Sequence, residues 1–384
     1  MEYINHSCQG ESHKSSNKEC QDYSLAVYDS TTHATIAVVC DGHGGDSYFR
    51  SAVGAKVASE ITVQKVVLFL QDTDSTFLKN CSSHNVGVLE AGNEDDQNEE
   101  ERTLDVMMRR LFKSIYAEWR YKIEQDAARE LTEWELDNVQ DCYRVLLKDE
   151  EKLVKVYGCT LMAVVWTPSF WFGFHIGDGK FVMLDHEYKM SQPIPWDEKC
   201  FLNKTTSLCD EEPFNGFRYC INVDAMGPVA FFLGSDGIDD TYGDGDKLYS
   251  FYGDIIKHIA KDGQEAVLHE LETDLPKLSE RGSKDDMSLA VVYDPLRIET
   301  AAIAVNDSQM ITVRNEMKAV EDGIQSKEEE IRRYKDTIDS IEKLKAELCL
   351  AEKELVRDKE TLRKLDSRLS KLKEYQVKND GLVI

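Results

Sequence analysis

The chain has 384 residues, and its 46 Lys and Arg against 72 Asp and Glu give a formal net charge of −26. Nucleic acids and anionic membrane surfaces attract cationic side chains, so this charge argues against both as partners. Hydrophobic residues make up 41% of the chain, which is too many for a disordered protein, and the length allows two or three domains.

The ten cysteines are scattered along the chain, with no C-x-x-C pair and no histidine spaced to complete a zinc site. We therefore expect free thiols in a reducing compartment. The opening residues MEYINHSCQGES do not resemble a secretion signal, and no stretch approaches the roughly 18 apolar residues of a membrane helix. These features predict a cytoplasmic protein.

Residues 22–40 contain two runs rich in β-branched and aromatic residues, DYSLAVYD and ATIAVVC, which predict a β-hairpin ending at Cys40. A glycine-rich corner follows, and residues 46–70 have the apolar spacing of a helix. Residues 72–101 hold nine acidic side chains and one lysine, and they offer too little apolar surface to become ordered. We expect a mobile acidic insertion there.

Residues 103–155 return to helical spacing, with a second helical stretch from about Trp134 to Val156. A long excursion at 186–216 interrupts the block of strands that follows, and two amphipathic helical stretches at 247–281 precede a last strand, MSLAVVYD. The other predicted strands are GCTLMAVVW, FWFGFHIG, KFVMLD, FRYCINV and VAFFLGSDG. Strands grouped together and flanked by helices indicate an α+β fold with stacked sheets covered by helices.

Over residues 317–376 the apolar residues recur at alternating steps of three and four, as in a coiled coil. Two consecutive steps of three at Leu344 form a stammer, which over-winds a supercoil locally. No Gly or Pro lies between Gly323 and Gly381, so we predict one helix of about 55 residues, about 80 Å long. A helix cannot bury such a seam alone, so we favour a partner helix, although a bend at the stammer would let the helix pack on itself.

The strongest chemical signal is a set of aspartates at the ends of predicted strands. Asp41 follows TIAVVC, Asp178 follows FWFGFHIG, Asp236 follows VAFFLGS, and Asp285 with Asp286 precedes MSLAVVY. Crowded carboxylates repel one another and resist ionisation, whereas a divalent cation removes that cost. Oxygen ligands without His or Cys suit Mg²⁺ or Mn²⁺, and two such ions about 3.5–4 Å apart can activate a water for attack on phosphorus.

Six motifs resemble, in their order and strand context, those of the metal-dependent protein phosphatase family, type 2C. They are QD at 21–22, DGHGG at 41–45, GCT at 158–160, GDG at 177–179, SDG at 235–237 and GSKDDMSLAVV at 282–292. The resemblance covers roughly residues 1–295, and the segments GESHKSSNKECQD and NKTTSL are most similar to the bacterial branch. It implies a four-layer αββα sandwich of two antiparallel sheets flanked by helices, with two or three Mn²⁺ or Mg²⁺ ions.

The same resemblance implies a set of metal ligands. Asp41 would bridge two metals, and the carbonyl of Gly42 would bind one of them. Asp236 and Asp285 would complete the first metal's shell, and Asp178 would help to hold a third ion.

Two further residues would act on the reaction itself. His43 would be the general acid that protonates the leaving oxygen, a role suited to a group that titrates near pH 7 beside cations. A histidine that makes structural hydrogen bonds at a turn is the alternative. Asp22 would orient a metal-bound water.

Several positions depart from the family pattern. Gln21 stands where the family has Glu, and Asn17 stands where it has the phosphate-binding Arg. Lys14, Lys18 and Arg50 are the candidates that could bind the phosphate instead, and Arg50 is favoured because a guanidinium binds phosphate in a bidentate manner. Lys180 is a further departure, because the usual motif ends in Arg at this position. The usual pair Asp-Asn is Asp285-Asp286 here, so either of these two aspartates could be the metal ligand.

We therefore predict a Mn²⁺- or Mg²⁺-dependent phosphatase that acts on phosphoserine and phosphothreonine in proteins through a metal-activated water, without a phosphoenzyme. The phosphatase domain would span residues 1–297, a linker 298–312, and a coiled coil for self-association or partner docking 313–378. Two alternatives stay open. One is a pseudophosphatase scaffold, suggested by Gln21 and Asn17, and the other is a phosphatase of a small phosphorylated molecule.

Overall fold

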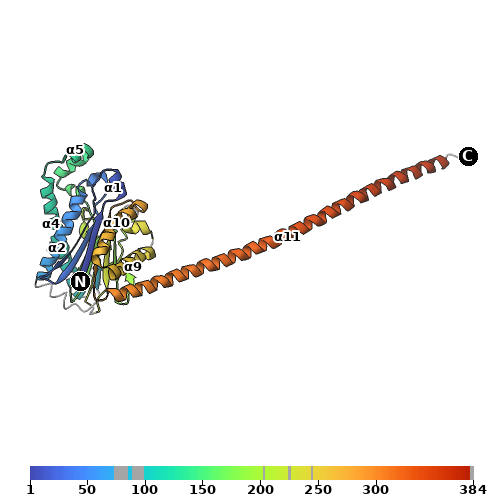
Figure 1. Cartoon of the computed structure of the whole chain (residues 1–384). Coiled ribbons are helices and arrows are strands. Elements are labelled where there is room, and N and C mark those ends of the chain that lie inside the picture. Colours follow the sequence, from blue (N-terminus) through green and yellow to red (C-terminus); the bar gives the residue numbers. More distant parts are fainter. Residues whose placement is uncertain (73–84, 89–98, 202–203, 224–225, 244, 381–384) are drawn as a thin grey trace. The chain divides into compact units, whose positions relative to one another are not determined.

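The structure is a computed structural model that describes every residue except 73–84, 89–98, 202–203, 224–225, 244 and 381–384. The chain divides into two compact units, Met1–Gln309 and Met310–Ile384, and Figure 1 labels several of the helices. Within the described residues, no helix combines the length and the apolar composition that crossing a membrane would require.

Two antiparallel sheets form the centre of the first unit. One sheet has the strand order β2 (Tyr23–Asp29), β3 (Ala34–Cys40), β5 (Leu161–Trp166), β6 (Trp171–Ile176), β9 (Arg218–Asn222) and β4 (Asn85–Val88). The other has the order β1 (Glu2–Cys8), β11 (Met287–Tyr293), β10 (Ala230–Gly234), β7 (Lys180–Leu184) and β8 (Met190–Ser191).

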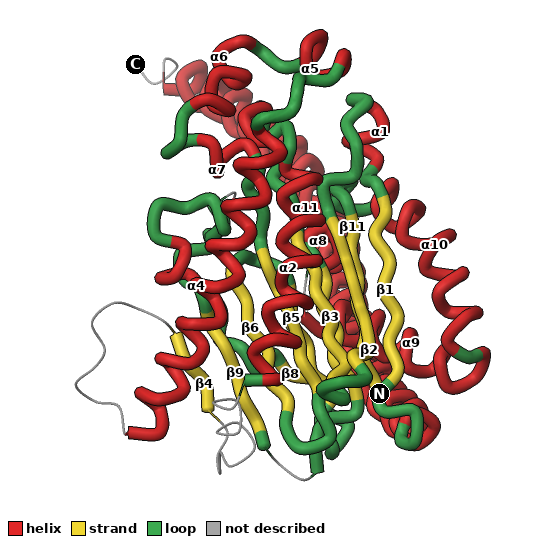
Figure 2. Tube along the Cα trace, turned by 90° about the vertical axis from the view of Figure 1, so that its left-hand side faces the viewer, coloured by secondary structure: helices red, strands yellow, loops and turns green. Residues whose placement is uncertain are grey.

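Helices cover the outer face of each sheet (Figure 2). On the β2–β4 sheet lie α2 (Ser51–Gln71) and α4 (Glu99–Ala127), and on the β1–β8 sheet lie α9 (Gly245–Asp262), α10 (Gln264–Arg281) and the start of α11 (Ile298–Asp380). The predicted four-layer sandwich is confirmed. The shorter elements are α1 (Glu11–Ser15), η1 (Asp46–Tyr48), α5 (Glu133–Asn138), α6 (Asp141–Arg144), η3 (Val145–Lys148), α7 (Leu153–Val156), η4 (Pro213–Gly216) and α8 (Asp236–Tyr242).

The central strands are buried on both faces, which explains their nearly continuous apolar sequences. Every residue of β3, β5, β6, β10 and β11 is buried. Between the two sheets, the rings of Trp166, Trp171 and Phe181 pack around Phe231 at centroid distances of 5.3, 4.8 and 5.6 Å. This inner layer holds the two sheets together, so that the strand ends of both sheets have fixed positions.

Most of the predicted elements are present, and the hairpin of β2 and β3 pairs antiparallel as expected. The helical stretch predicted for 134–156 is instead broken into α5, α6, η3 and α7. A capping box at Thr132 starts α5, and the Asp149 carboxylate accepts hydrogen bonds from two following backbone N–H groups, which forms a turn. The apolar residues therefore keep helical spacing within each short helix. Hydrogen bonds between side chains and the backbone interrupt the continuous helix that was expected.

Three other segments differ from expectation or lie outside the description. Strand β1 is not among the predicted strands, and its pairing partner is β11, a strand nearly 300 residues away in the chain. The expected linker 298–312 is the helical start of α11. In the acidic insertion, residues 85–88 form β4 against β9, while 73–84 and 89–98 lie outside the described residues.

Candidate metal centre

The predicted metal-binding aspartates lie at one end of the two sheets. Because β2 and β3 are antiparallel neighbours, Asp22 before β2 and Asp41 after β3 leave their sheet side by side. Likewise β10 and β11 are antiparallel neighbours, so that Asp236 after β10 and Asp285 before β11 leave the other sheet together. The connection after β6 carries Asp178.

These carboxylates act strongly on one another. Burial raises the pKa of Asp41 well above its ordinary value, and the negative charges of Asp236 and Asp22 raise it further. Burial also raises the pKa of Asp22, with the charge of Asp286 adding to it, and raises that of Asp236 to about 6. Without a cation, the folded chain therefore favours protonated carboxyls here.

The chemistry of this cluster fits a hard divalent cation. The Oδ2 atom of Asp22 is buried and has no hydrogen-bond partner among the described residues. Within those residues, no three His, Cys, Asp or Glu side chains already surround one point as a preformed ligand set. The donors are nevertheless all oxygen and carry excess negative charge, which is the combination that Mn²⁺ and Mg²⁺ require.

The DGHGG corner is held in place by its neighbours. The Asp41 N–H donates to Thr160 Oγ1 at 3.0 Å, and the Thr160 N–H donates to the Asp41 carbonyl at 2.8 Å. A Cβ atom on Gly42 would lie 2.4 Å from the carbonyl oxygen of Gln21, so a larger residue does not fit without a shift of the backbone. This corner needs glycine for its close approach to the segment that carries Asp22.

The structure separates the roles of Asp285 and Asp286. Asp286 is buried, and its carboxylate accepts hydrogen bonds from Gly10 N–H and Gln21 N–H, both at 2.6 Å, while His13 Nδ1 lies 2.8 Å from it. Although burial opposes ionisation, these contacts hold the pKa of Asp286 below its ordinary value. Asp285 is exposed and therefore remains the member of the pair that can reach a metal.

His43 is half-buried and lies against residues of the long excursion at 186–216. Its Nε2 lies 2.8 Å from Ser207 Oγ, and because the Ser207 hydroxyl donates to the Cys159 carbonyl at 3.0 Å, His43 is the donor. The ring of Tyr48 meets the imidazole edge-on at 4.8 Å. Burial lowers the pKa of His43 to about 4, so the imidazole is neutral at pH 7 in this arrangement. Nothing in the local sequence signals the contact with Ser207.

Arg50 does not bind phosphate. Its side chain is only 1% exposed and donates to the Glu135 carboxylate, to the Asp126 carboxylate and carbonyl, and to the Tyr157 hydroxyl. Arg129 also pairs with Glu135. The prediction for Arg50 is therefore wrong, because its guanidinium already donates to partners in a buried ionic network that joins α2, α4 and α5.

This network predicts acid sensitivity. Burial opposes the ionisation of Glu135, but hydrogen bonds from Arg50, Thr132 and Arg129 hold its pKa at about 2. A pKa lowered in the folded state stabilises the fold fully above the ordinary value of about 4.5, and the contribution is lost as pH falls toward 2. We expect Glu135→Gln to remove about 2 kcal/mol of this pH dependence, measured by urea unfolding between pH 7 and 3.

The matched control for this prediction is Glu133→Gln, an exposed glutamate of the same helix, which should leave the pH dependence as it is in the natural chain. If Glu135→Gln and the natural chain lose stability in parallel over this pH range, the ionic network is not the source of the acid sensitivity.

Two lysines border the cluster of aspartates. Lys18 is partly exposed, and its Nζ donates to the Gly44 carbonyl at 2.9 Å, beside the DGHGG corner. Lys180, which follows Asp178, pairs with Asp239 at 3.4 Å and lies 3.6 Å from the ring centroid of Trp196. Lys180 thus ties the loop of Asp178 to α8 and to the excursion. Among the three cations considered for the phosphate, Lys18 is the one that contacts the DGHGG corner in the described part of the chain, while Lys14 is exposed on α1.

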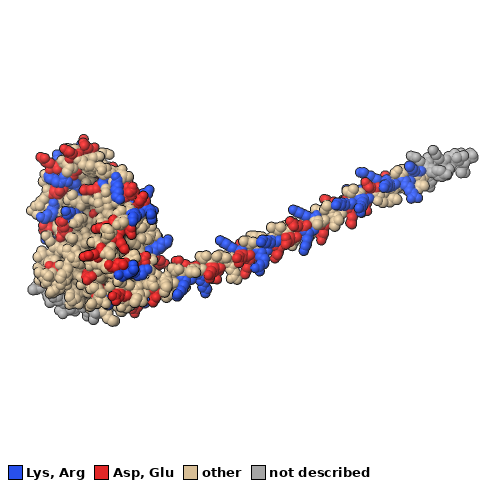
Figure 3. All heavy atoms as spheres, viewed as in Figure 1, with Lys and Arg blue, Asp and Glu red and all other residues tan. Residues whose placement is uncertain are grey.

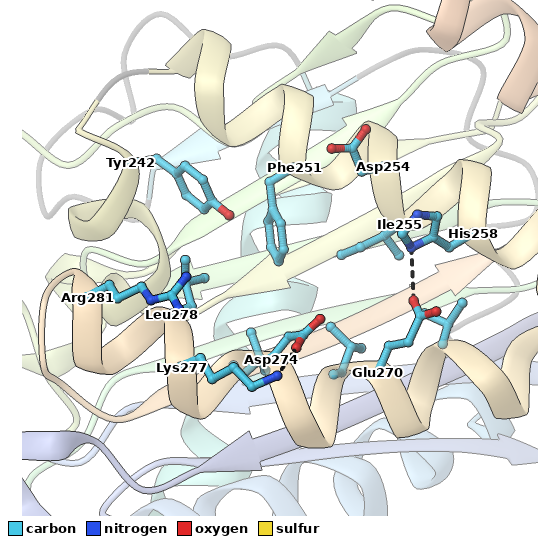
Figure 4. Close-up of a pocket in the computed structure, with 13 residues that line it drawn as sticks. Tyr242, Phe251, Asp254, Ile255, His258, Glu270, Asp274, Lys277, Leu278 and Arg281 are labelled. Atoms are coloured by element: carbon cyan, nitrogen blue, oxygen red, sulfur yellow. Dashed lines mark hydrogen bonds and ion pairs between the residues drawn. The ribbon is translucent and has the colours of Figure 1, made fainter.

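A groove of about 530 Å³ lies elsewhere, between α9 and α10 (Figure 4). Its lining includes Phe251, Ile255 and Leu271, and at its edge His258 Nδ1 lies 2.9 Å from Glu270. None of the aspartates of the candidate centre lines it, so this groove is separate from the metal chemistry.

Comparison with known proteins identifies the family. A protein-family model described as "Protein phosphatase 2C" matches residues 9–273. No curated protein matches the chain. Solved structures with a similar fold include a serine/threonine phosphatase of S. agalactiae, which is 17% identical with a TM-score of 0.42 and alignments that cover 76% of this chain and 98% of that chain.

Two further structures are similar to the same degree. The catalytic domain of serine threonine protein phosphatase PstP, solved in complex with two manganese ions, is 16% identical with a TM-score of 0.40 and coverages of 76% and 96%. PppA, a T6SS regulatory component in Pseudomonas aeruginosa, is 16% identical with a TM-score of 0.42 and coverages of 76% and 97%. Because these likenesses are weak, the family rests on the match over residues 9–273, and by that match the chain belongs to the protein phosphatase 2C family of metal-dependent serine/threonine phosphatases.

Proposed function

We propose that this chain hydrolyses phosphoserine and phosphothreonine in proteins with the help of Mn²⁺ or Mg²⁺ ions held at the ends of its two sheets. The observation that supports this most is the cluster of Asp22, Asp41 and Asp236 at the sheet ends, where burial raises the pKa of all three carboxyls and the charges of neighbouring aspartates raise it further. Cations would remove that repulsion, so the cluster favours metal binding over protonation at neutral pH.

The residues proposed to hold the ions are those of the sheet ends. Asp41 would bind both of two ions, the Gly42 carbonyl would bind one of them, Asp236 and Asp285 would complete the ligands of the first ion, and Asp178 would help to hold a third ion. When bound, the ions would supply an activated water and would stabilise the negative charge that develops on the phosphoryl group. Asp285 is favoured over its neighbour because it is exposed and Asp286 is already saturated with hydrogen bonds.

Three side chains are proposed to act around the substrate. Asp22 has a free buried oxygen that would orient the water. Lys18 would bind the phosphate as the cation beside the DGHGG corner. His43 would protonate the leaving oxygen, since a phosphate dianion beside the imidazole would raise its low pKa toward neutrality.

Phosphate release by the full chain tests this function. We expect release from phosphoserine and phosphothreonine peptides with added Mn²⁺ or Mg²⁺, and none above background in excess chelator, because the carboxylates alone cannot activate water. Release that persists in chelator would contradict the proposal. Peptide binding with Mn²⁺ but no release would support the scaffold alternative, and faster release from nucleotide or sugar phosphates would support the small-molecule alternative.

The domain organisation is part of the same proposal. Residues 1–297 would be the phosphatase domain and residues 313–378 a coiled coil for self-association or partner docking. The exposed apolar residues along α11 support the second assignment. Nine cysteines of the described chain are free, which fits a reducing compartment such as the cytoplasm.

A further inference from the structure

The second unit carries an apolar seam that nothing covers in the part of the chain that the structure describes. From Met317 to Leu372 the seam residues are about half exposed or more, for example Ile331 at 52% and Leu362 at 67%. Basic and acidic side chains are interspersed along the same helix (Figure 3), and residues 311–384 hold 17 of each sign. A neutral helix with an apolar seam is soluble only if another helix covers the seam.

The seam changes phase at its middle. Up to Ile341 the heptad has a positions at Met317, Ile324, Ile331 and Ile338, and d positions at Val320, Lys327, Tyr334 and Ile341. After the stammer, the a positions are Leu348, Leu355, Leu362 and Leu369, and the d positions are Leu344, Ala351, Asp358, Leu365 and Leu372. Each half therefore has one charged interruption of its seam, and the two interruptions have opposite signs.

In an antiparallel coiled coil the two helices run in opposite directions. Each a position of one helix therefore faces a d position of the other helix. With the two-fold axis between Leu344 and Lys345, every seam residue from Met317 to Ile341 meets a seam residue of the other half, and Leu344 lies at the axis itself. The layers are Met317 with Leu372, Val320 with Leu369, Ile324 with Leu365, Lys327 with Leu362, Ile331 with Asp358, Tyr334 with Leu355, Ile338 with Ala351 and Ile341 with Leu348.

The charged interruptions distinguish the two orientations. In a parallel pair in register, Lys327 faces a second Lys327 and Asp358 faces a second Asp358, which places like charges inside the seam. In the antiparallel pair, Lys327 and the Asp358 of the second copy lie in adjacent layers, about 6 Å apart along the axis. The lysine side chain spans that distance, so the two interruptions neutralise each other.

The positions that flank the seam favour the same orientation. The e position of each heptad follows its d position, and antiparallel pairing brings the e positions of the two helices together. The resulting pairs of opposite charge are Glu328 with Lys359, Lys335 with Glu352 and Glu342 with Lys345. One pair, Glu321 with Asp366, has like charge. Within residues 317–372, parallel pairing brings each g position against the following e position and gives only two pairs of opposite charge, Glu330 with Lys335 and Glu354 with Lys359, and one of like charge, Glu347 with Glu352.

We propose that two copies of this chain associate through residues 317–372 as an antiparallel coiled coil centred between Leu344 and Lys345. The inference rests on the proposed coiled coil and not on the hydrolysis reaction. The two phosphatase units are then connected to opposite ends of a paired segment about 80 Å long.

Sedimentation equilibrium of the full chain tests the proposal. We expect a dimer, and we expect Lys327→Glu or Asp358→Lys to weaken it by about tenfold, since each change places like charges at two symmetry-related contacts. The double variant Lys327→Glu/Asp358→Lys should restore the dimer. The controls Glu329→Lys and Asp336→Lys, on the outer face, should not change it.

Cysteine crosslinking tests the orientation in a chain whose exposed Cys142 and Cys349 are replaced by serine. Val320→Cys with Leu369→Cys should form an intermolecular disulfide, whereas Val320→Cys alone should not. A monomer at every concentration, crosslinking by Val320→Cys alone, or a double charge swap that fails to rescue the dimer would overturn the proposal. Phosphate release, measured on the same variants, is expected to stay unchanged, so loss of the dimer and loss of activity are seen separately.

Discussion

Asp41→Asn and Asp236→Asn should each lower Mn²⁺-dependent phosphate release from a phosphopeptide by at least about a hundredfold. Asparagine keeps the size of the side chain but removes the charge that would bind the cations. The same change relieves the repulsion that raises the pKa of both carboxyls, so the metal-free variants should unfold no more easily than the natural chain. Steady-state release and urea unfolding measure the two effects.

The matched control is Asp307→Asn, an exposed aspartate of the first unit, which should leave the rate as it is. Binding of Mn²⁺, followed by isothermal titration, should be weakened in both active-centre variants and not in the control. Full activity in either variant would contradict the assignment of these carboxylates to the metal centre.

Arg50→Met is expected to destabilise the first unit by about 3 kcal/mol, measured by urea unfolding at pH 7. The substitution keeps the apolar stem but leaves the carboxylates of Glu135 and Asp126 without the guanidinium that pairs with them. The KM for a phosphopeptide should remain unchanged at a temperature where the variant is folded, because Arg50 is buried away from solvent.

Arg120→Met provides the comparison. Arg120 pairs with Glu124 on the exposed side of α4, and both side chains are more than a third exposed, so its loss should cost less than about 0.5 kcal/mol. If Arg50→Met has the same stability as the natural chain and a strongly raised KM, Arg50 binds phosphate after all and the structural interpretation is wrong.

The different outcomes for Arg50 and Asp41 show what kind of feature a sequence reveals. Asp41 stands directly after a long β-branched run, so its place at a strand end follows from local pattern alone. The prediction for Arg50 rests on the chemistry of its guanidinium, which binds phosphate in a bidentate manner. Its partners Asp126 and Glu135 are far away in the chain, and only packing of α2 against α4 and α5 brings them to it.

The same distinction applies to the pair 285–286. Both are aspartates in one turn, and no local pattern separates them. The separation comes from Gly10, His13 and Gln21, which surround Asp286 because β1 pairs with β11 and brings the N-terminal residues to this turn. Likewise, the contact of His43 with Ser207 depends on where the excursion folds back.

The two-sheet architecture, the aspartates at the strand ends, the long C-terminal helix and the opposite charges that interrupt its seam can all be predicted from the amino-acid sequence. Each of these follows from hydrophobic periodicity or from short motifs, which act over a few residues. Which lysine, arginine, carboxylate and imidazole already have partners is visible only in the folded chain. Those answers depend on burial and on partners that are distant in sequence, and burial changes the cost of a charge far more than any local pattern does.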